Sequence, residues 1–200
     1  MKTVWTAVAI ATLFLGTALA AGPGETRKAP ELAYSVPSGG KQVPKLLSQY
    51  RGKVVALEFI FTTCPHCQHA SILMTQLQKD YGSRGFQALD VAINPNADLL
   101  VDNFVRDFQV GFPVGWTTRD EFLTFMNFSF ADRFVVPQLV LIDRKGYIRY
   151  QTPALGDGDY EKQMQESTIR SRIEEMLNSD RPQSTSVRHS SGTGVLASKR

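Results

Sequence analysis

The chain has 200 residues, and 42% of them are hydrophobic, which is enough for one well-packed domain rather than two. The formal net charge is +3, of which Lys2 contributes one unit and the residues from Asp180 onward contribute three, so the body between them carries −1. A near-neutral body with a basic tail, and with no basic stripe interleaved with aromatic residues, excludes nucleic acid as a partner.

The first 21 residues form an export signal by pattern. In "MKTVWTAVAIATLFLGTALAAG" one cation precedes an apolar stretch, and Ala18-Leu19-Ala20 provides the small residues of a cleavage site. An uncleaved membrane anchor is the alternative, because residues 4–21 lie at the lower edge of the length that spans a bilayer. In either case we expect the body outside the cytoplasm, in the bacterial periplasm or on the extracytoplasmic face of the membrane, where disulfides persist.

Composition divides the rest of the chain. Residues 22–30 are rich in Pro, Gly and charge and are predicted to be a linker, and residues 31–178 are predicted to be the folded domain. "ELAYSVPSGGKQV" predicts two short strands around a Ser-Gly-Gly turn, and residues 45–50 predict a short helical turn. Residues 179–200 are rich in Ser, Thr and Gly and are predicted to be disordered.

A buried strand followed by an amphipathic helix comes next. "KVVALEFIF" is a continuous apolar run interrupted only by Glu58, which is typical of a central strand covered on both faces. After Cys64 the apolar period becomes helical, and Gly82 with Gly85 ends that helix. The helix presents one apolar face, which consists of Ala70, Leu73, Met74, Leu77 and Tyr81.

The second half alternates in the same way. "FQALDVAI" and "FPVGW" are predicted strands, a helix with Val101 and Phe104 on its inner face lies between them, and residues 119–128 are a predicted short helix. "QLVLIDRKGYIRYQT" predicts a hairpin, and residues 159–178 a last helix. The order predicts an α/β fold with a central mixed β-sheet flanked by helices and an N-terminal β-hairpin extension.

Cys64 and Cys67 are the only cysteines, and three interpretations of the pair differ in what they explain. A structural disulfide across two residues closes a very small loop and adds little stability. A zinc site needs four ligands, usually from two separated pairs, and the chain offers only His66 and His69 nearby, so we expect no metal. A redox pair accounts for more of the surrounding residues.

The redox interpretation rests on the junction between strand and helix. Pro65 suits the first helical position, so the Cys64 sulfur lies near the unpaired amides of the helix N-terminus, and Cys67 one turn later is placed to resolve a mixed disulfide. The helix terminus stabilises a thiolate by up to about 2 kcal/mol. A protonated His66 roughly 4 Å away adds up to ~4 kcal/mol, before any discount for exposure. A stabilised thiolate makes the disulfide the better oxidant.

The sequence Cys64-Pro65-His66-Cys67 after a buried strand resembles the thioredoxin superfamily. "ALEFIFTTCPHC" is similar to the active-site strand of the disulfide oxidant DsbA, whereas "YRGKVVALEF" and "VVPQLVLIDRKGYI" are similar to the TlpA/ResA branch of extracytoplasmic thioredoxins. The resemblance covers residues 29–178. Because only a strand and one or two helices are predicted between Cys67 and Pro137, the chain lacks the large helical insertion of DsbA and is placed in the TlpA-like branch.

The resemblance implies a thioredoxin-like fold and a thiol–disulfide oxidoreductase. It implies that Glu58 is the buried acid that relays a proton to or from Cys67, and that Pro137 after Val136 is the cis-proline that faces the cysteines and helps to bind substrate. The chemistry needs no cofactor beyond the disulfide that Cys64 and Cys67 form. The implied partners are cysteine-containing proteins and a membrane redox partner. His66 favours an oxidant and the TlpA-like body a reductant, so the direction of electron flow stays open.

Two related functions remain as alternatives. A peroxiredoxin-like peroxidase has the same fold, but that family places a Thr three positions before its reactive cysteine, where this chain has Phe61. A copper-binding chaperone using Cys64 and Cys67 normally has its cysteines one residue further apart and a distal histidine. Peroxide consumption and metal content separate these alternatives from a thiol–disulfide oxidoreductase.

Overall fold

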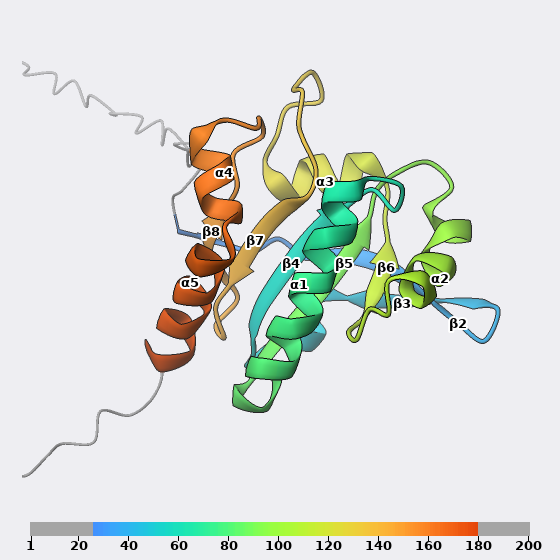
Figure 1. Ribbon diagram of the computed structural model, residues 1–200. Coiled ribbons are helices and arrows are strands. Elements are labelled where there is room, and N and C mark those ends of the chain that lie inside the picture. Colours follow the sequence, from blue (N-terminus) through green and yellow to red (C-terminus); the bar gives the residue numbers. More distant parts are fainter. Residues whose placement is uncertain (1–25, 180–200) are drawn as a thin grey trace, which may run out of the picture.

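The computed structural model describes residues 26–179 (Figure 1). The predicted export signal at residues 1–21 lies outside the described residues, as does almost all of the predicted disordered tail. None of the helices within residues 26–179 has the length and apolar character needed to cross a bilayer.

Eight strands and five α-helices make up the described chain. The strands are β1 Arg27–Lys28, β2 Ala33–Ser38, β3 Lys41–Leu46, β4 Val54–Ile60, β5 Phe86–Ala92, β6 Val114–Trp116, β7 Gln138–Ile142 and β8 Tyr147–Gln151. The helices are α1 Pro65–Tyr81, α2 Ala97–Asp107, α3 Arg119–Met126, α4 Gly158–Met164 and α5 Glu166–Ser179, with short 3-10 turns at Leu47–Tyr50 and Gly82–Arg84.

The strands form one mixed sheet in the order β1-β8-β7-β4-β5-β6-β2-β3. β4 pairs in parallel with β5, and β5 with β6, through crossovers that carry α1 and α2. The remaining neighbours are antiparallel, including β7 beside β4 and the β2–β3 hairpin. This confirms the predicted mixed sheet and the N-terminal hairpin. β3 forms one outer edge of the sheet and the two-residue β1 the other.

Alternation along β4 divides the core between the two faces of the sheet. Val54, Ala56 and Ile60 pack beneath α1, α2 and α5. Val55, Leu57 and Phe59 pack against α3 and the N-terminal segment on the other face. All seven residues of β4 are buried, as expected for a central strand covered on both sides. Figure 1 shows α1 and α5 on the near side of the sheet and α3 behind it.

Two boundaries differ from those predicted. The helix expected over residues 159–178 is two helices, because Gln165 has an extended backbone; no residue of α4 is fully buried, whereas α5 buries its face from Ile169 onward. In the predicted linker 22–30, Arg27 and Lys28 pair with β8. As predicted, Gly82 and Gly85 end the helix: Gly82 caps α1, and the 3-10 turn that follows ends on Gly85, whose φ of 90° is left-handed.

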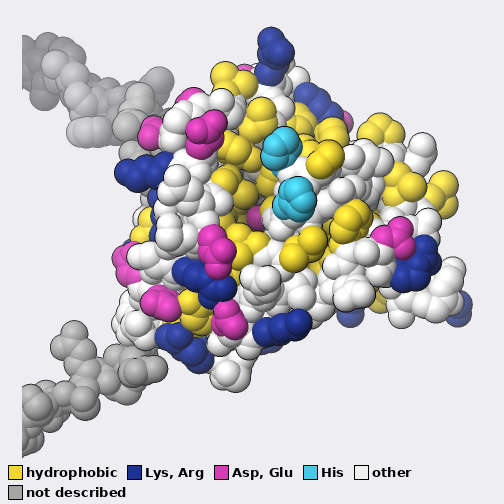
Figure 2. All heavy atoms as spheres, in the orientation of Figure 1, with side chains coloured by type: hydrophobic (Ala, Val, Ile, Leu, Met, Phe, Trp, Pro, Cys, Tyr) yellow, Lys and Arg dark blue, Asp and Glu magenta, His cyan; other side chains and the backbone are white. Residues whose placement is uncertain are grey.

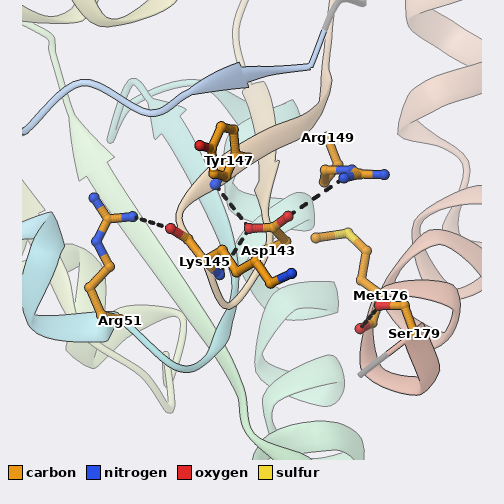
Figure 3. A network of polar contacts seen from close by, with 7 residues as sticks. All are labelled: Arg51, Asp143, Lys145, Tyr147, Arg149, Met176 and Ser179. Carbon is orange, nitrogen blue, oxygen red and sulfur yellow. Dashed lines mark hydrogen bonds and ion pairs between the residues drawn. The ribbon is translucent and has the colours of Figure 1, made fainter. Parts of the chain in front are cut away.

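The β7–β8 hairpin turns through a small polar network at the end of the sheet away from the N-terminus of α1 (Figure 3). One carboxylate oxygen of Asp143 accepts the backbone N–H groups of Lys145 and Tyr147 at 3.0 and 2.9 Å. The other lies 3.6 Å from Arg149, and Arg51 donates to the Lys145 carbonyl at 3.1 Å. These contacts hold the turn between β7 and β8 in place.

Candidate active site

The two cysteines occupy the junction between β4 and α1. Cys64 is the N-cap of α1, with extended backbone angles of −86° and 121°, and Pro65 is the first helical residue. Proline suits this position because its φ is already helical and it lacks an N–H that the helix would leave unpaired. Cys64 is half-buried, and Cys67 is fully buried against the core beneath α1. Both are free thiols in this structure.

The environments of the two sulfurs differ. The Cys67 sulfur accepts the Phe61 backbone N–H at 3.4 Å. Burial raises the pKa of Cys67, the bond from Phe61 opposes this, and Cys64 and Glu58 raise the pKa further. Cys67 is therefore held as a neutral thiol in the reduced protein, whereas Cys64 is the sulfur that solvent and a reacting partner can reach.

Val136 and Pro137 lie directly opposite Cys64. Their peptide bond is cis, the geometry that the resemblance implied. The Cys64 thiol donates to the Val136 carbonyl at 3.9 Å. The side-chain amide of Gln138 holds this loop in place from below by donating to the carbonyls of Val135 and Pro153 at 2.9 and 3.1 Å.

Glu58 lies on β4 beneath Cys67 and is 1% exposed. Burial raises the pKa of Glu58 well above its usual range, and the charge of Asp90 raises it further. Within residues 26–179, its Oε2 atom has no hydrogen-bond partner. A carboxyl group in such a place keeps its proton to higher pH than an exposed one and is able to give it up when a base appears beside it.

The structure also adds two side chains that the sequence analysis missed. Asp90 of β5 is completely buried and pairs in register with Glu58 across the parallel strands. Tyr160 of α4 donates its hydroxyl to the Pro137 carbonyl at 2.6 Å. Burial raises the pKa of Tyr160, as do the nearby Glu58, Cys67 and Cys64 groups, so this hydroxyl faces the same centre. The acid inside the predicted strand "FQALDVAI" was the one available signal for Asp90.

A cavity of about 480 Å³ opens beside the cysteines, between α1, the loop before β7, and α4. Glu58 contributes to its lining, so the cavity gives a buried carboxyl access to the surface. Figure 2 shows hydrophobic side chains gathered around the two histidines of the described chain. The cavity is lined by Glu58, His66, His69, Ala70, Leu73, Val135, Val136, Pro137, Gly156, Tyr160, Glu161, Met164 and Ile169.

The structure brings together most of the residues singled out from the sequence. The active-site turn holds Cys64, Pro65 and Cys67 together. Glu58 lies near Cys67, and the Val136–Pro137 loop lies beside Cys64. His66 is exposed on the rim of the cavity, where water weakens its influence on the Cys64 sulfur relative to the undiscounted value. Within residues 26–179, no three side chains among His, Cys, Asp and Glu lie close enough to share a metal ion.

Comparison with known proteins gives matches over most of the chain. The sequence profile of the Redoxin family matches residues 25–164. Thiol-disulfide oxidoreductase ResA of Geobacillus kaustophilus (strain HTA426) is 31% identical over 103 residues, which are 52% of this chain and 56% of that protein. The ResA protein of Geobacillus thermodenitrificans is 29% identical over a stretch of the same length. The chain thus spans little more than half the length of these curated relatives.

Solved structures give the same fold. A thiol:disulfide interchange protein from Bacteroides sp. superposes with a TM-score of 0.60 at 15% identity, over 84% of this chain and 97% of that one. A thiol:disulfide interchange protein of the thioredoxin family from Chlorobium tepidum TLS superposes with a TM-score of 0.57 at 21% identity, over 76% and 97% of the two chains. At these identities the likeness concerns the fold.

Proposed function

Since the chain belongs to the Redoxin family, has a thioredoxin-like fold and falls in the TlpA/ResA-like group, we propose that it is a thiol–disulfide oxidoreductase acting through Cys64 and Cys67. One observation carries the proposal. A reachable thiol at a helix N-terminus and a buried thiol one turn later lie between a buried carboxyl group and a cis-proline loop. This arrangement separates an attacking sulfur from a resolving sulfur.

The exchange follows from this difference between the sulfurs. In the reducing direction the Cys64 thiolate attacks a substrate disulfide, a bond forms between Cys64 and one substrate sulfur, and the other substrate sulfur leaves as a thiolate. Cys67 then loses its proton and attacks Cys64, which forms the Cys64–Cys67 disulfide and releases the second substrate thiolate. Two electrons pass from the protein to the substrate. The oxidising direction is the same sequence reversed.

Glu58 manages the proton of Cys67 in this scheme. When a substrate thiolate opens the Cys64–Cys67 disulfide, Cys67 leaves with the bonding electron pair in a fully buried place, where a thiolate is costly. A neutral Glu58 donates its proton to that sulfur, and the proton returns when the disulfide forms again. Glu58 lines the cavity, so it exchanges protons with solvent there.

Substrates are proposed to be cysteine-containing proteins that approach as extended chains. The half-buried Cys64 lies against the Val136 carbonyl, and the backbone of Val136 is the group proposed to pair with such a chain when the Cys64 thiol reacts. The neighbouring apolar cavity accepts a hydrophobic side chain next to the substrate cysteine. The leader pattern in residues 1–21 supports work in the periplasm or at the outer face of the membrane, with a membrane redox partner that resets the pair.

The test uses the two cysteine variants in insulin reduction and in oxidation of a dithiol peptide. Cys64→Ser is expected to abolish both activities, and Cys67→Ser to trap mixed disulfides that a reducing agent releases. The exposed Ser83, changed to Ala, serves as a control that should keep full activity. Activity in both cysteine variants would overturn the proposal. Consumption of more than one peroxide per protein would support a peroxidase instead.

A further inference from the structure

Asp90 is a second fully buried carboxyl group, and the proposed exchange described above makes no use of it. It is 0% exposed and lies on β5 between Ala88 and Ala92, which belong to the apolar core beneath α1. Its Cα partner across the parallel ladder is Glu58, so the two acids lie side by side on one face of the sheet. Burying two neighbouring carboxylates is very costly, so at least one of them carries a proton at neutral pH.

Ser71 joins Asp90 to the helix that carries the cysteines. The Ser71 hydroxyl lies 2.5 Å from Asp90 Oδ2 and 3.0 Å from the Cys67 carbonyl oxygen. A serine hydroxyl has one proton and cannot donate to both oxygens at once. When it donates to the Cys67 carbonyl, Asp90 must be the donor to Ser71 and must itself be protonated. Within the part of the chain that the structure describes, Glu58 Oε2 and Asp90 Oδ1 have no partner.

Other ionisable groups surround this pair from three sides. Burial raises the pKa of both carboxyls, mutual repulsion adds to this for Glu58, and the Ser71 bond opposes it for Asp90. On the β6 side the Asp90 backbone N–H donates to the Pro113 carbonyl at 3.2 Å, and Asp90 pairs in register with Val114. On the side of the cavity, the ionisable groups near Glu58 are Cys64, Cys67, His66, His69, Tyr160 and Glu161.

We propose that Glu58 and Asp90 work as one proton-holding pair, in which Asp90 is a positioning residue that keeps Glu58 protonated at neutral pH so that it can supply Cys67. The inference rests on the proposed function. When a substrate thiolate breaks the disulfide, the sulfur of Cys67 leaves with the bonding electrons and takes the Glu58 proton. The negative charge of Asp90 then favours the return of a proton to Glu58, which takes it from solvent through the cavity that it lines.

A pair behaves differently from a single acid as the pH changes. Two interacting carboxyls release their protons in two steps that belong to the pair. Replacing Asp90 by Asn keeps the size and the hydrogen bond to Ser71 but removes the charge that repels the Glu58 carboxylate. Glu58 then ionises at lower pH, because no like charge opposes its ionisation.

The experiment compares the pH dependence of dithiothreitol oxidation by the disulfide form of the full chain and of its Asp90→Asn variant. The ratio of the two values of kcat/KM cancels the ionisation of the probe. We expect a ratio near one at acid pH and a roughly tenfold loss of kcat/KM above neutrality, where Glu58 of the variant has already lost its proton. Asp98→Asn, which removes the same charge from an exposed site on α2, should leave the profile unchanged.

Several outcomes would overturn the inference. A ratio that is flat across pH, whether at one or below, would assign Asp90 a structural role and leave the proposed function intact. A wild-type protein that oxidises no dithiol at any pH would remove the proposed function and the inference with it. If Asp90→Asn does not fold, the carboxylic acid infrared band of the wild type decides. Loss of this band in two coupled steps as the pH rises supports the pair. Loss of the band in one independent step near the ordinary pH range of a carboxylic acid contradicts it.

Discussion

Substitution of Glu58 by Gln should make the stability of the reduced protein less sensitive to pH. Burial and the neighbouring Asp90 charge raise the pKa of Glu58 well above its usual range in the folded state. In the unfolded chain a Glu ionises near pH ~4.3. Above that pH the folded protein therefore binds more protons than the unfolded protein, so the free energy of unfolding falls as the pH rises.

The size of the effect follows from proton linkage. The contribution of Glu58 is fully present below about pH 4 and is lost progressively until the pH passes the folded pKa. Each extra proton costs about 1.4 kcal/mol of stability per pH unit in that window. Because Glu58 is only 1% exposed, solvent screening takes little from this value. Between pH 5 and pH 7 the wild type should therefore lose stability relative to Glu58→Gln, by at most about 3 kcal/mol.

Urea unfolding of both proteins under reducing conditions, at half-unit steps from pH 4 to pH 8, measures this difference. As the pH rises toward neutrality, the unfolding free energy of the wild type should fall relative to that of Glu58→Gln. The wild type should therefore compare best with the variant at acid pH. The exposed Asp98→Asn variant should run parallel to the wild type. Parallel curves for Glu58→Gln would mean that Glu58 is ionised in the folded protein, and the proton-relay reasoning would then be wrong.

Three other substitutions test separate parts of the structure. Phe122→Ala removes a fully buried ring whose centroid lies 4.9 Å from that of Phe59, on the sheet face opposite the cysteines, and should cost about 3–5 kcal/mol in urea unfolding without changing the redox potential. Gln138→Leu leaves loop carbonyls without donors and should cost ~1–3 kcal/mol while raising KM for a dithiol peptide; an unchanged KM would contradict the supporting role of Gln138. His66→Pro should make the disulfide harder to reduce in equilibrium with glutathione, and an unchanged potential would dismiss His66 as a tuning residue.

Local patterns predict the cysteine half of the site. The apolar run before Cys64 predicts a central strand, the change to helical spacing predicts α1, and Pro65 marks its first residue. These features depend on residues close together in the chain, and the structure has them at the predicted places. The cis-proline loop followed from the resemblance, because no local rule makes one X-Pro bond cis.

The partners contributed by other elements could not be predicted in this way. Asp90 meets Glu58 only through the register of β4 with β5, and sequence alone does not give that register for strands buried on both faces. Tyr160 reaches the Pro137 carbonyl from α4, a separate short helix that ends at the extended backbone of Gln165 rather than the first part of one long helix. The pairing of Arg27 and Lys28 with β8 likewise depends on an exposed edge that forms only in the folded sheet.

The outermost strand β3 is poorly suited to pair with a strand of another molecule. Pro44 has no N–H to offer a neighbouring chain, and Lys41 and Lys45 place positive charge along the same border. The opposite border is occupied by a strand of only two residues. Edge-to-edge pairing of sheets from two molecules, the first step toward fibrils, is thereby discouraged at both margins.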